Sequence, residues 1–279
     1  MDTAELLDWA DIQASDRAET GSLLAAEPGP QVQAALRVLR RRWMEIGAPP
    51  PAPGIDELAW LHALLRFIPE QLEGYRGRGV PEAVARATLA DIGRHVAISR
   101  TTNGHFGLET WKWLTEQASG TLFQLGRLHF HLIPGPAGIP GLRAGEKVLG
   151  MHIPETGPLR PGLVQESLAR AVQFFGECFP EHPVRFGHCH SWLLDPYLAR
   201  QLPSDSNIVA FANRFTRFGE LFDAPGDAVY FTFRTRDMTK LAGLPRESRL
   251  QQVVLERIGA GGSWQAAQGY LDLPGVSSP

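Results

Sequence analysis

The sequence predicts an α/β (α+β) protein, in which a helical first half is followed by a mixed β-sheet with one parallel strand–helix–strand step. Two observations predict this class. Apolar residues recur at helical spacing up to about residue 118, and short strand-like segments bounded by Pro and Gly dominate from about residue 119 onward. We therefore expect a helical N-terminal domain at residues 1–118 and a second domain at residues 119–279.

The helical half is predicted from apolar stripes. Apolar residues alternate in steps of three and four over 32–46 and again over 58–72, which is the pattern of a helix that buries one face. The segment 47–54 between them contains four prolines and cannot continue a helix. Residues 85–96 predict a further helix, and a short one begins near Leu108.

The centre of the second half predicts a crossover unit. Residues 121–133 alternate with period two, which predicts one long strand, and residues 148–153 predict the next. Pro161 opens a helix over 161–177 with apolar residues on one stripe, and 184–191 is a further strand. A connecting helix of this length favours parallel pairing of the strands on either side of it.

The remaining elements are predicted from composition and capping residues. Asp195 and Pro196 start a short helix, with Asp195 as its N-cap. Residues 207–215 and 228–234 are interpreted as strands, and 247–258 as a helix.

Composition excludes several functional classes. With 43% hydrophobic and 20% charged residues and a net charge of −3, the chain is globular and has no general attraction for nucleic acid or acidic membranes. The first residues lack the cationic start and apolar run of a signal peptide, and no apolar stretch reaches membrane-spanning length. The chain has two cysteines, Cys178 and Cys189, which are too few for a disulfide framework. We expect a cytoplasmic protein with a small-molecule acceptor and no nucleic-acid or membrane partner, and the sequence predicts no oligomeric state.

Three segments carry a resemblance to a known family. They are LGRLHF at 125–130, HIPETGPL at 152–159 and CHSWLLDP at 189–196. Together they resemble a bacterial family that joins an N-acyltransferase-type N-terminal domain to a GNAT-like C-terminal domain. The resemblance implies an acyltransferase that uses acyl-CoA or acetyl-CoA as co-substrate, bound where two parallel strands splay apart, with its pyrophosphate at the start of the crossover helix.

The resemblance places the splay between strands 148–153 and 184–191, and the phosphate loop at 154–162. The usual loop pattern, Gln/Arg-x-x-Gly-x-Gly/Ala, is replaced here by a segment with three prolines, which supply no N–H donors. Glu155 adds a negative charge that Arg160 can offset, and Gly157 permits close approach of the backbone. The loop therefore predicts either an acyl-CoA site or a site for another ligand.

Candidate site residues follow from these positions. Acid–base chemistry at a thioester needs groups that titrate or donate a proton, and histidine titrates near neutral pH. The candidate catalytic residues are His190, His152, Glu155 and Tyr197. The candidate cofactor-binding residues are Gly157, Arg160 and Gly162, and the candidate substrate-binding residues are Trp192 and Arg214.

The sequence leaves two alternatives to an acyltransferase. The His-x-His pairs at 129–131 and 188–190 are also compatible with a metal-using enzyme, although no metal ligand set is favoured. The GNAT-like domain can also be a non-catalytic ligand-binding module. Cys189 alternates with its two histidine neighbours along a strand, so we expect a buried structural cysteine.

Overall fold

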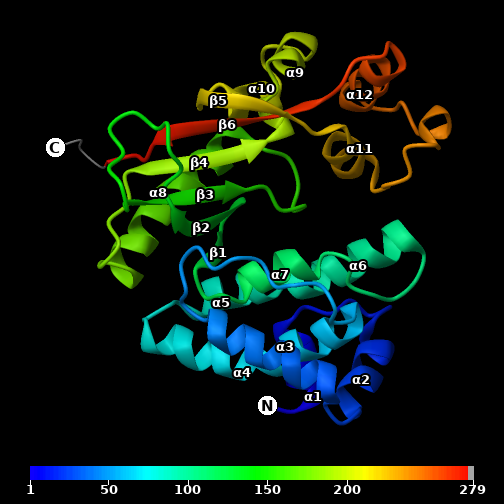
Figure 1. Cartoon of the computed structure of the whole chain (residues 1–279), viewed down its shortest axis with the longest axis vertical. Helices are drawn as coiled ribbons and strands as arrows, with labels where there is room; N and C mark the ends of the chain where they lie inside the picture. The colour runs from blue at the N-terminus through cyan, green and yellow to red at the C-terminus, as the bar shows by residue number, and fades with distance from the viewer. Residues whose placement is uncertain (276–279) are drawn as a thin grey trace. The chain divides into compact units, whose positions relative to one another are not determined.

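The computed structural model describes residues 1–275 (Figure 1). It divides into two compact units. The first contains residues 1–125, 129–134 and 173–182, and the second contains 126–128, 135–172 and the remainder from Pro183. One six-stranded sheet has the order β1-β2-β3-β4-β6-β5. This confirms the predicted class of a helical region followed by a mixed sheet.

The first unit is built on helices. Their bounds are α1 Thr3–Trp9, α2 Arg17–Ala25, α3 Pro30–Arg42, α4 Glu57–Gly77, α5 Glu82–Leu89, α6 Asp91–Asn103 and α7 Trp111–Gln117. The stripes predicted on α3 and α4 are buried, with Leu39 1% and Leu61 0% exposed. Asp56 caps α4 through its side chain, and Gly104 ends α6 in the left-handed conformation. A buried apolar face therefore stabilises α3 and α4, and local residues fix the start of α4 and the end of α6.

Two helix predictions need correction. The stripe over 85–96 belongs to two helices, α5 and α6, because the chain turns at Ala90 and starts a new helix at Asp91. The helix predicted over 32–46 ends at Arg42, since Met44 adopts a positive φ of 61°.

The single strand predicted over 121–133 is wrong. It is a hairpin of β1 (Leu122–Leu125) and β2 (Leu128–Pro134). The turn lies at Gly126, whose φ of +71° is readily adopted only by glycine. Alternation continues across the turn and therefore hides it from a period-two pattern.

The predicted parallel crossover is confirmed. Strand β3 (Lys147–His152) and strand β4 (Phe186–Ser191) pair in parallel, and α8 (Pro161–Cys178) connects them. The predicted helix stripe is buried, with Val164 0% and Leu168 3% exposed. The other strands are β5 (Thr216–Asp223) and β6 (Gln265–Asp272); β6 pairs antiparallel with both β4 and β5.

Two further segments were predicted wrongly as strands. Residues 207–215 contain α10 (Asn207–Ala212), which Ser206 caps by accepting the N–H of Val209. Residues 228–234 belong to α11 (Pro225–Phe233), which begins with Pro225 in its first turn. In both segments a helix-starting residue that lies before the predicted strand, the cap Ser206 or the first-turn Pro225, outweighs the apolar, strand-like composition.

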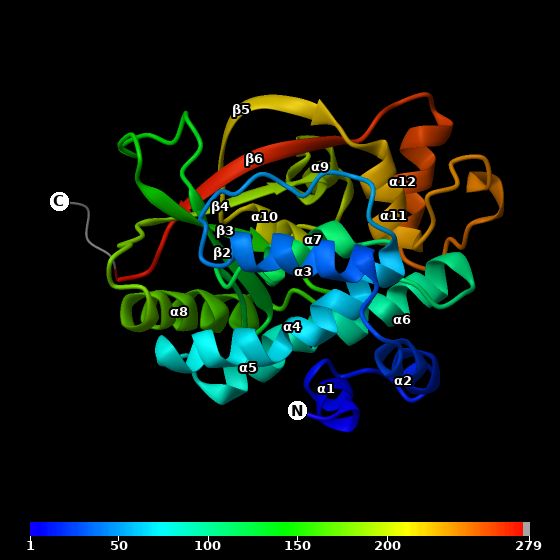
Figure 2. The same ribbon diagram turned by 60° about the horizontal axis from the view of Figure 1, so that its bottom comes forward.

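The last helices and the apolar core of the second unit complete the fold. Asp195 caps α9 (Pro196–Gln201), as predicted, and α12 (Arg249–Gly259) confirms the helix expected over 247–258. Two short 3-10 turns lie at Trp192–Leu194 and Leu241–Gly243. Figure 2 shows α11 beside α12, and Ala228, Val253 and Trp264 share one buried cluster there.

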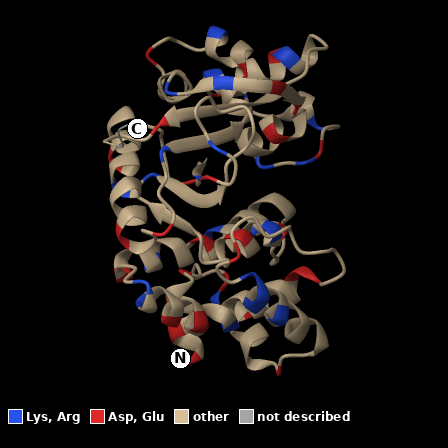
Figure 3. Ribbon diagram, turned by 60° about the vertical axis from the view of Figure 1, so that its left-hand side comes forward, with Lys and Arg blue, Asp and Glu red and all other residues tan. Residues whose placement is uncertain are grey.

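Charge is distributed along the ribbon rather than gathered. Figure 3 shows acidic and basic residues on helices and loops of both units. Among residues 1–275, none of the helices combines the length and the apolar character that a membrane span requires.

Candidate active site

The parallel strands β3 and β4 separate before either strand ends. Their pairing joins Leu149 to Gly187 and Gly150 to His188. Strand β4 continues in register with β6 to Ser191, and β3 continues to His152. The two strands therefore diverge at their carboxyl ends, which is the place where the resemblance implies a thioester ligand.

The loop after β3 leads directly into the start of α8. Gly157 lies in this loop with a φ of +112°, and Arg160, exposed, precedes the first helical residue. Gly162 is in the first turn of α8, where backbone N–H groups have no partner within the helix. The first turn of an 18-residue helix favours an anion, because the positive end of the helix dipole lies there.

Three of the predicted ligand-binding positions thus lie together at this loop, and a fourth joins them. Arg214 donates to the side chain of Gln165 at 2.9 Å and to the carbonyl of Pro161 at 3.2 Å. It follows α10 and lies beside the first turns of α8. This places a further cation next to the candidate anion site.

Arg234 neutralises the acidic residue of the loop, and the sequence did not reveal this. Its guanidinium pairs with the Glu155 carboxylate at 2.6 Å and lies over the rings of Tyr230 and Phe231. Arg234 ends α11 in the left-handed conformation, with φ 54° and ψ 41°. Arg160, in contrast, remains exposed. The pair joins residues 79 positions apart (234 − 155), so spacing carried no signal of it.

A second missed residue is Arg127, in the hairpin turn. Its guanidinium donates to three carbonyls of the loop, those of Pro154, Gly157 and Pro158. Only 8% of Arg127 is exposed. In the sequence, Arg127 falls within the period-two pattern of 121–133 and is therefore interpreted as an ordinary strand residue. Only the turn at Gly126 shows that Arg127 lies in a hairpin turn, from which it contacts the loop.

The histidines of β4 differ in environment. His188 is 9% exposed, and its Nε2 lies 3.3 Å from the side-chain oxygen of Gln268. Burial, and then the neighbouring charge of His190, lower the pKa of His188 despite the hydrogen bond to Gln268. His190 is exposed and its ring lies 5.5 Å from that of Phe222, which is itself 46% exposed. Of the two, His190 is the one that a substrate can reach.

Cys189 lies between them and is buried, as predicted. It is 1% exposed, and burial raises the pKa of its thiol to about 12. A thiol with this pKa is protonated at neutral pH and is a poor nucleophile.

The remaining predicted residues lie at two other places. His152 ends β3 and is half-buried. Trp192 is 5% exposed within the apolar cluster around Trp264. Tyr197 begins α9, with its ring 5.8 Å from that of Trp264 and the guanidinium of Arg257 over it at 4.1 Å. The structure thus places Trp192 and Tyr197 together, in packed surroundings around Trp264.

The metal alternative has no ligand set in the structure. No group of three or more His, Cys, Asp or Glu side chains suited to a metal ion occurs within residues 1–275. The pair at 129–131 belongs to the first unit, and the pair at 188–190 belongs to the second. Burial and the charge of Arg42 lower the pKa of His131 to about 4.

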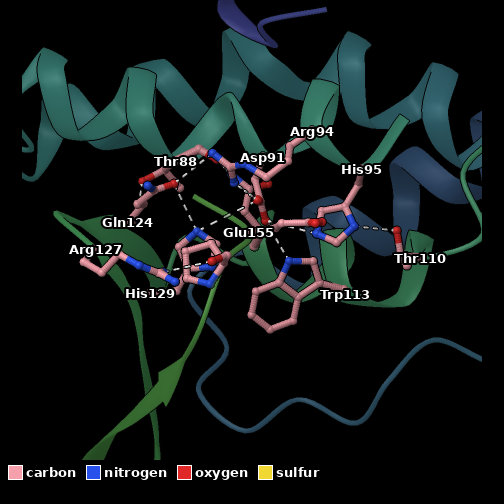
Figure 4. Close-up of polar contacts among 12 residues, drawn as sticks. Thr88, Asp91, Arg94, His95, Thr110, Trp113, Gln124, Arg127, His129 and Glu155 are labelled. Atoms are coloured by element: carbon pink, nitrogen blue, oxygen red, sulfur yellow. Dashed lines mark hydrogen bonds and ion pairs between the residues drawn. The ribbon is translucent and has the colours of Figure 1, made fainter. Parts of the chain in front are cut away.

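The first unit holds a buried polar cluster around Asp91, which the sequence did not reveal (Figure 4). The Asp91 carboxylate is 1% exposed. It accepts the indole N–H of Trp113 at 2.7 Å and pairs with Arg94 and, at 3.6 Å, with His95. The Nε2 atom of His129 lies 3.9 Å from Oδ1 of Asp91, the oxygen that also pairs with Arg94.

The charge of Asp91 is stabilised within this cluster. Burial by itself raises the pKa of the carboxyl, but the charges of His129, His95 and Arg94 and the Trp113 hydrogen bond outweigh it and lower that pKa. Because the contacts come from α6, α7 and β2, which are separated in sequence, only folding brings them together.

Two models of known protein families match this chain. The model of the N-acyltransferase N-terminal domain matches residues 1–120, and that of the GNAT-like C-terminal domain matches residues 122–271. Among curated proteins, none matches significantly.

Solved structures of acyltransferases are similar over almost the whole chain. One, in complex with decanoyl-CoA, is 31% identical with a TM-score of 0.86, covering 98% of this chain and 88% of that chain. Another, with decanoyl-CoA and teicoplanin, is 31% identical with a TM-score of 0.83 and the same coverage. A mutant acyltransferase with octanoyl-CoA is 32% identical with a TM-score of 0.82, again at 98% and 88%. This chain therefore belongs to the acyltransferase family that joins an N-acyltransferase N-terminal domain to a GNAT-like C-terminal domain.

Proposed function

We propose that the chain is an acyl-CoA-dependent N-acyltransferase that transfers a medium-chain acyl group to an amine of a glycopeptide-type acceptor. The observation that carries this is the divergence of β3 and β4 directly before a loop and helix start that suit a pyrophosphate. The similar structures that hold decanoyl-CoA, octanoyl-CoA or teicoplanin support the class of donor and acceptor.

In the proposed reaction the acceptor amine attacks the thioester carbonyl. A C–N bond forms, the C–S bond breaks, and coenzyme A leaves as a thiolate that takes up a proton. The amine loses one proton to a base. His190 is our proposed base, because it is exposed at the diverging end of β4. Tyr197 remains the predicted proton donor to the thiolate, and Trp192 a predicted wall of the substrate site. His152, at the end of β3, remains a second predicted acid–base residue.

The apolar ring beside His190 suits an acyl chain. Phe222 is 46% exposed and contacts the His190 ring edge-to-face. An exposed aromatic side chain next to the candidate base offers apolar surface to a ligand that carries a hydrocarbon chain.

The first test is a thermal-shift titration of the protein with coenzyme A, acetyl-CoA, octanoyl-CoA and decanoyl-CoA. A second assay monitors the acylation of teicoplanin by mass spectrometry. A ligand at 100 times its Kd stabilises the native state by about 2.7 kcal/mol. The Tm should then rise by about 5–10 °C and most strongly with the medium-chain donors. No shift with any of these thioesters would contradict the proposal.

The Glu155–Arg234 pair gives a prediction about the donor site. Arg234→Gln leaves the Glu155 carboxylate uncompensated beside the proposed pyrophosphate site, so we expect the Kd for decanoyl-CoA to rise about 10-fold. Adding Glu155→Gln should restore most of this affinity, because the uncompensated charge is then removed. Isothermal titration calorimetry of the two single variants and the double variant measures both effects.

The pair is partly exposed, and we expect little change in Tm for any of these variants. If the double variant binds as weakly as Arg234→Gln alone, Arg234 acts on the ligand directly and the neutralising role is wrong.

A further inference from the structure

The two-residue turn Gly126–Arg127 contacts both parts of the proposed pyrophosphate site. The first contact is with the loop. The Arg127 guanidinium donates from Nε to the Pro158 carbonyl at 3.2 Å, from Nη1 to the Pro154 carbonyl at 2.9 Å, and from Nη2 to the Gly157 carbonyl. One buried side chain thus holds three carbonyls within five residues of a loop that has no regular secondary structure.

The second contact is with the start of α8. The backbone N–H of Arg127 donates to the Ser167 hydroxyl oxygen at 2.7 Å, and this hydroxyl donates to the Leu163 carbonyl at 2.9 Å. Ser167 is fully buried. Gly126 makes the approach possible, since a Cβ at this position would lie 2.8 Å from the Ser167 hydroxyl oxygen.

Holding these carbonyls also orients the donors of the loop. In a trans peptide the N–H points opposite to the C=O of the same unit. The carbonyls of Pro154 and Pro158 face Arg127, so the N–H groups of Glu155 and Leu159 face away from it. Because three prolines remove other N–H groups from this segment, the direction of the remaining donors matters for an anion.

We propose that Arg127 is the positioning residue of the pyrophosphate site. It acts through the loop and through Ser167 and does not itself contact the donor. This inference rests on the proposed function, since it assumes that acyl-CoA binds at the loop 154–160 and the start of α8. It explains how a loop that departs from the usual glycine-rich pattern still presents N–H groups to a phosphate.

The test compares two donors that differ in the pyrophosphate. Kd values are measured by isothermal titration calorimetry for decanoyl-CoA and for decanoyl-pantetheine, which lacks the pyrophosphate and nucleotide. For Arg127→Met we expect the Kd of decanoyl-CoA to rise about 10-fold or more, with that of decanoyl-pantetheine nearly unchanged. Arg127→Lys retains the positive charge but offers one donor nitrogen in place of three, and should give an intermediate rise.

The matched control is Arg185→Met. Arg185 also donates to a loop carbonyl, that of Gly141 at 2.6 Å, and pairs with Glu146 at 2.9 Å, but in a different loop. For Arg185→Met, we expect the ratio of the Kd for decanoyl-CoA to the Kd for decanoyl-pantetheine to equal that of the wild type. If Arg127→Met fails to fold, Arg127→Lys and Ser167→Ala are compared in the same way.

Each outcome separates the two proposals. If the wild type binds no decanoyl-CoA, the proposed function is wrong. If the wild type binds it and the Arg127 variants bind it equally well, the positioning role is wrong. An equal loss of affinity for both donors also overturns the role, because it indicates a general structural defect.

Discussion

Replacing His190 with alanine should lower kcat at least about 100-fold, because a positioned base contributes about 10²–10⁴-fold to the rate. The side chain is exposed at the carboxyl end of β4, beyond the last residue pair with β3. Its removal takes away no buried packing, so the Tm should change little. The measurement is the rate of coenzyme A release from decanoyl-CoA with teicoplanin as acceptor, over a range of pH.

The matched control is His105→Ala, an exposed histidine of the first unit that lies outside the proposed site. It should leave kcat unchanged. A folded His190→Ala protein with the wild-type rate would exclude His190 as the base and leave His152 and Glu155 as the predicted candidates.

Replacing Asp91 with asparagine should produce the largest loss of stability. The carboxylate is 1% exposed and faces Arg94, His95 and His129, which lose their shared negative partner in this variant. Removing one member of a buried charged group costs about 3–5 kcal/mol. For a chain of this size we expect the Tm to fall by roughly 10 °C.

The control for Asp91→Asn is Asp8→Asn, which removes an exposed carboxylate paired with Arg17 in the same unit. We expect little change in Tm there, since solvent screens exposed pairs. Thermal unfolding of both variants, monitored by circular dichroism, gives the comparison. Equal Tm values for the two variants would show that the Asp91 cluster does not stabilise the fold.

The Asp91 cluster also predicts a dependence of stability on pH. Folding lowers the pKa of Asp91, so the folded state binds its proton more weakly than the unfolded chain does. The stabilising contribution is therefore complete above the unfolded pKa of about 3.9 and is lost as pH falls through the lower folded pKa. The difference in stability between wild type and Asp91→Asn should shrink as the pH is lowered below about 4.

Local patterns in the sequence determined a large part of the fold. The apolar stripes over 58–72 and 161–177, the Asp195 cap and the parallel crossover were predicted and are present, and the stripe predicted over 32–46 is present as far as Arg42. A helix buries one face and is capped by residues within one turn, so the residues that determine a helix are close together in the sequence. The family resemblance likewise rested on three short contiguous segments.

Tertiary structure decided the rest, because the determining partners are distant in sequence. Strand β6 was missed since its place in the sheet depends on pairing with β4 across 76–86 residues and with β5 across 42–54 residues. The hairpin at Gly126 was hidden by continued alternation, and the cap Ser206 and the first-turn Pro225 overrode strand-like composition.

For the candidate site, too, one part could be predicted from the sequence and another part only from the tertiary structure. Because Gly157, Arg160 and Gly162 are close in the sequence, the sequence predicted that they lie in the loop after β3 and at the start of α8. Only the folded chain brings Arg127 to the carbonyls of that loop and Arg234 to Glu155, because a hydrogen bond or ion pair depends on atoms within a few ångströms and leaves no periodic mark in the sequence.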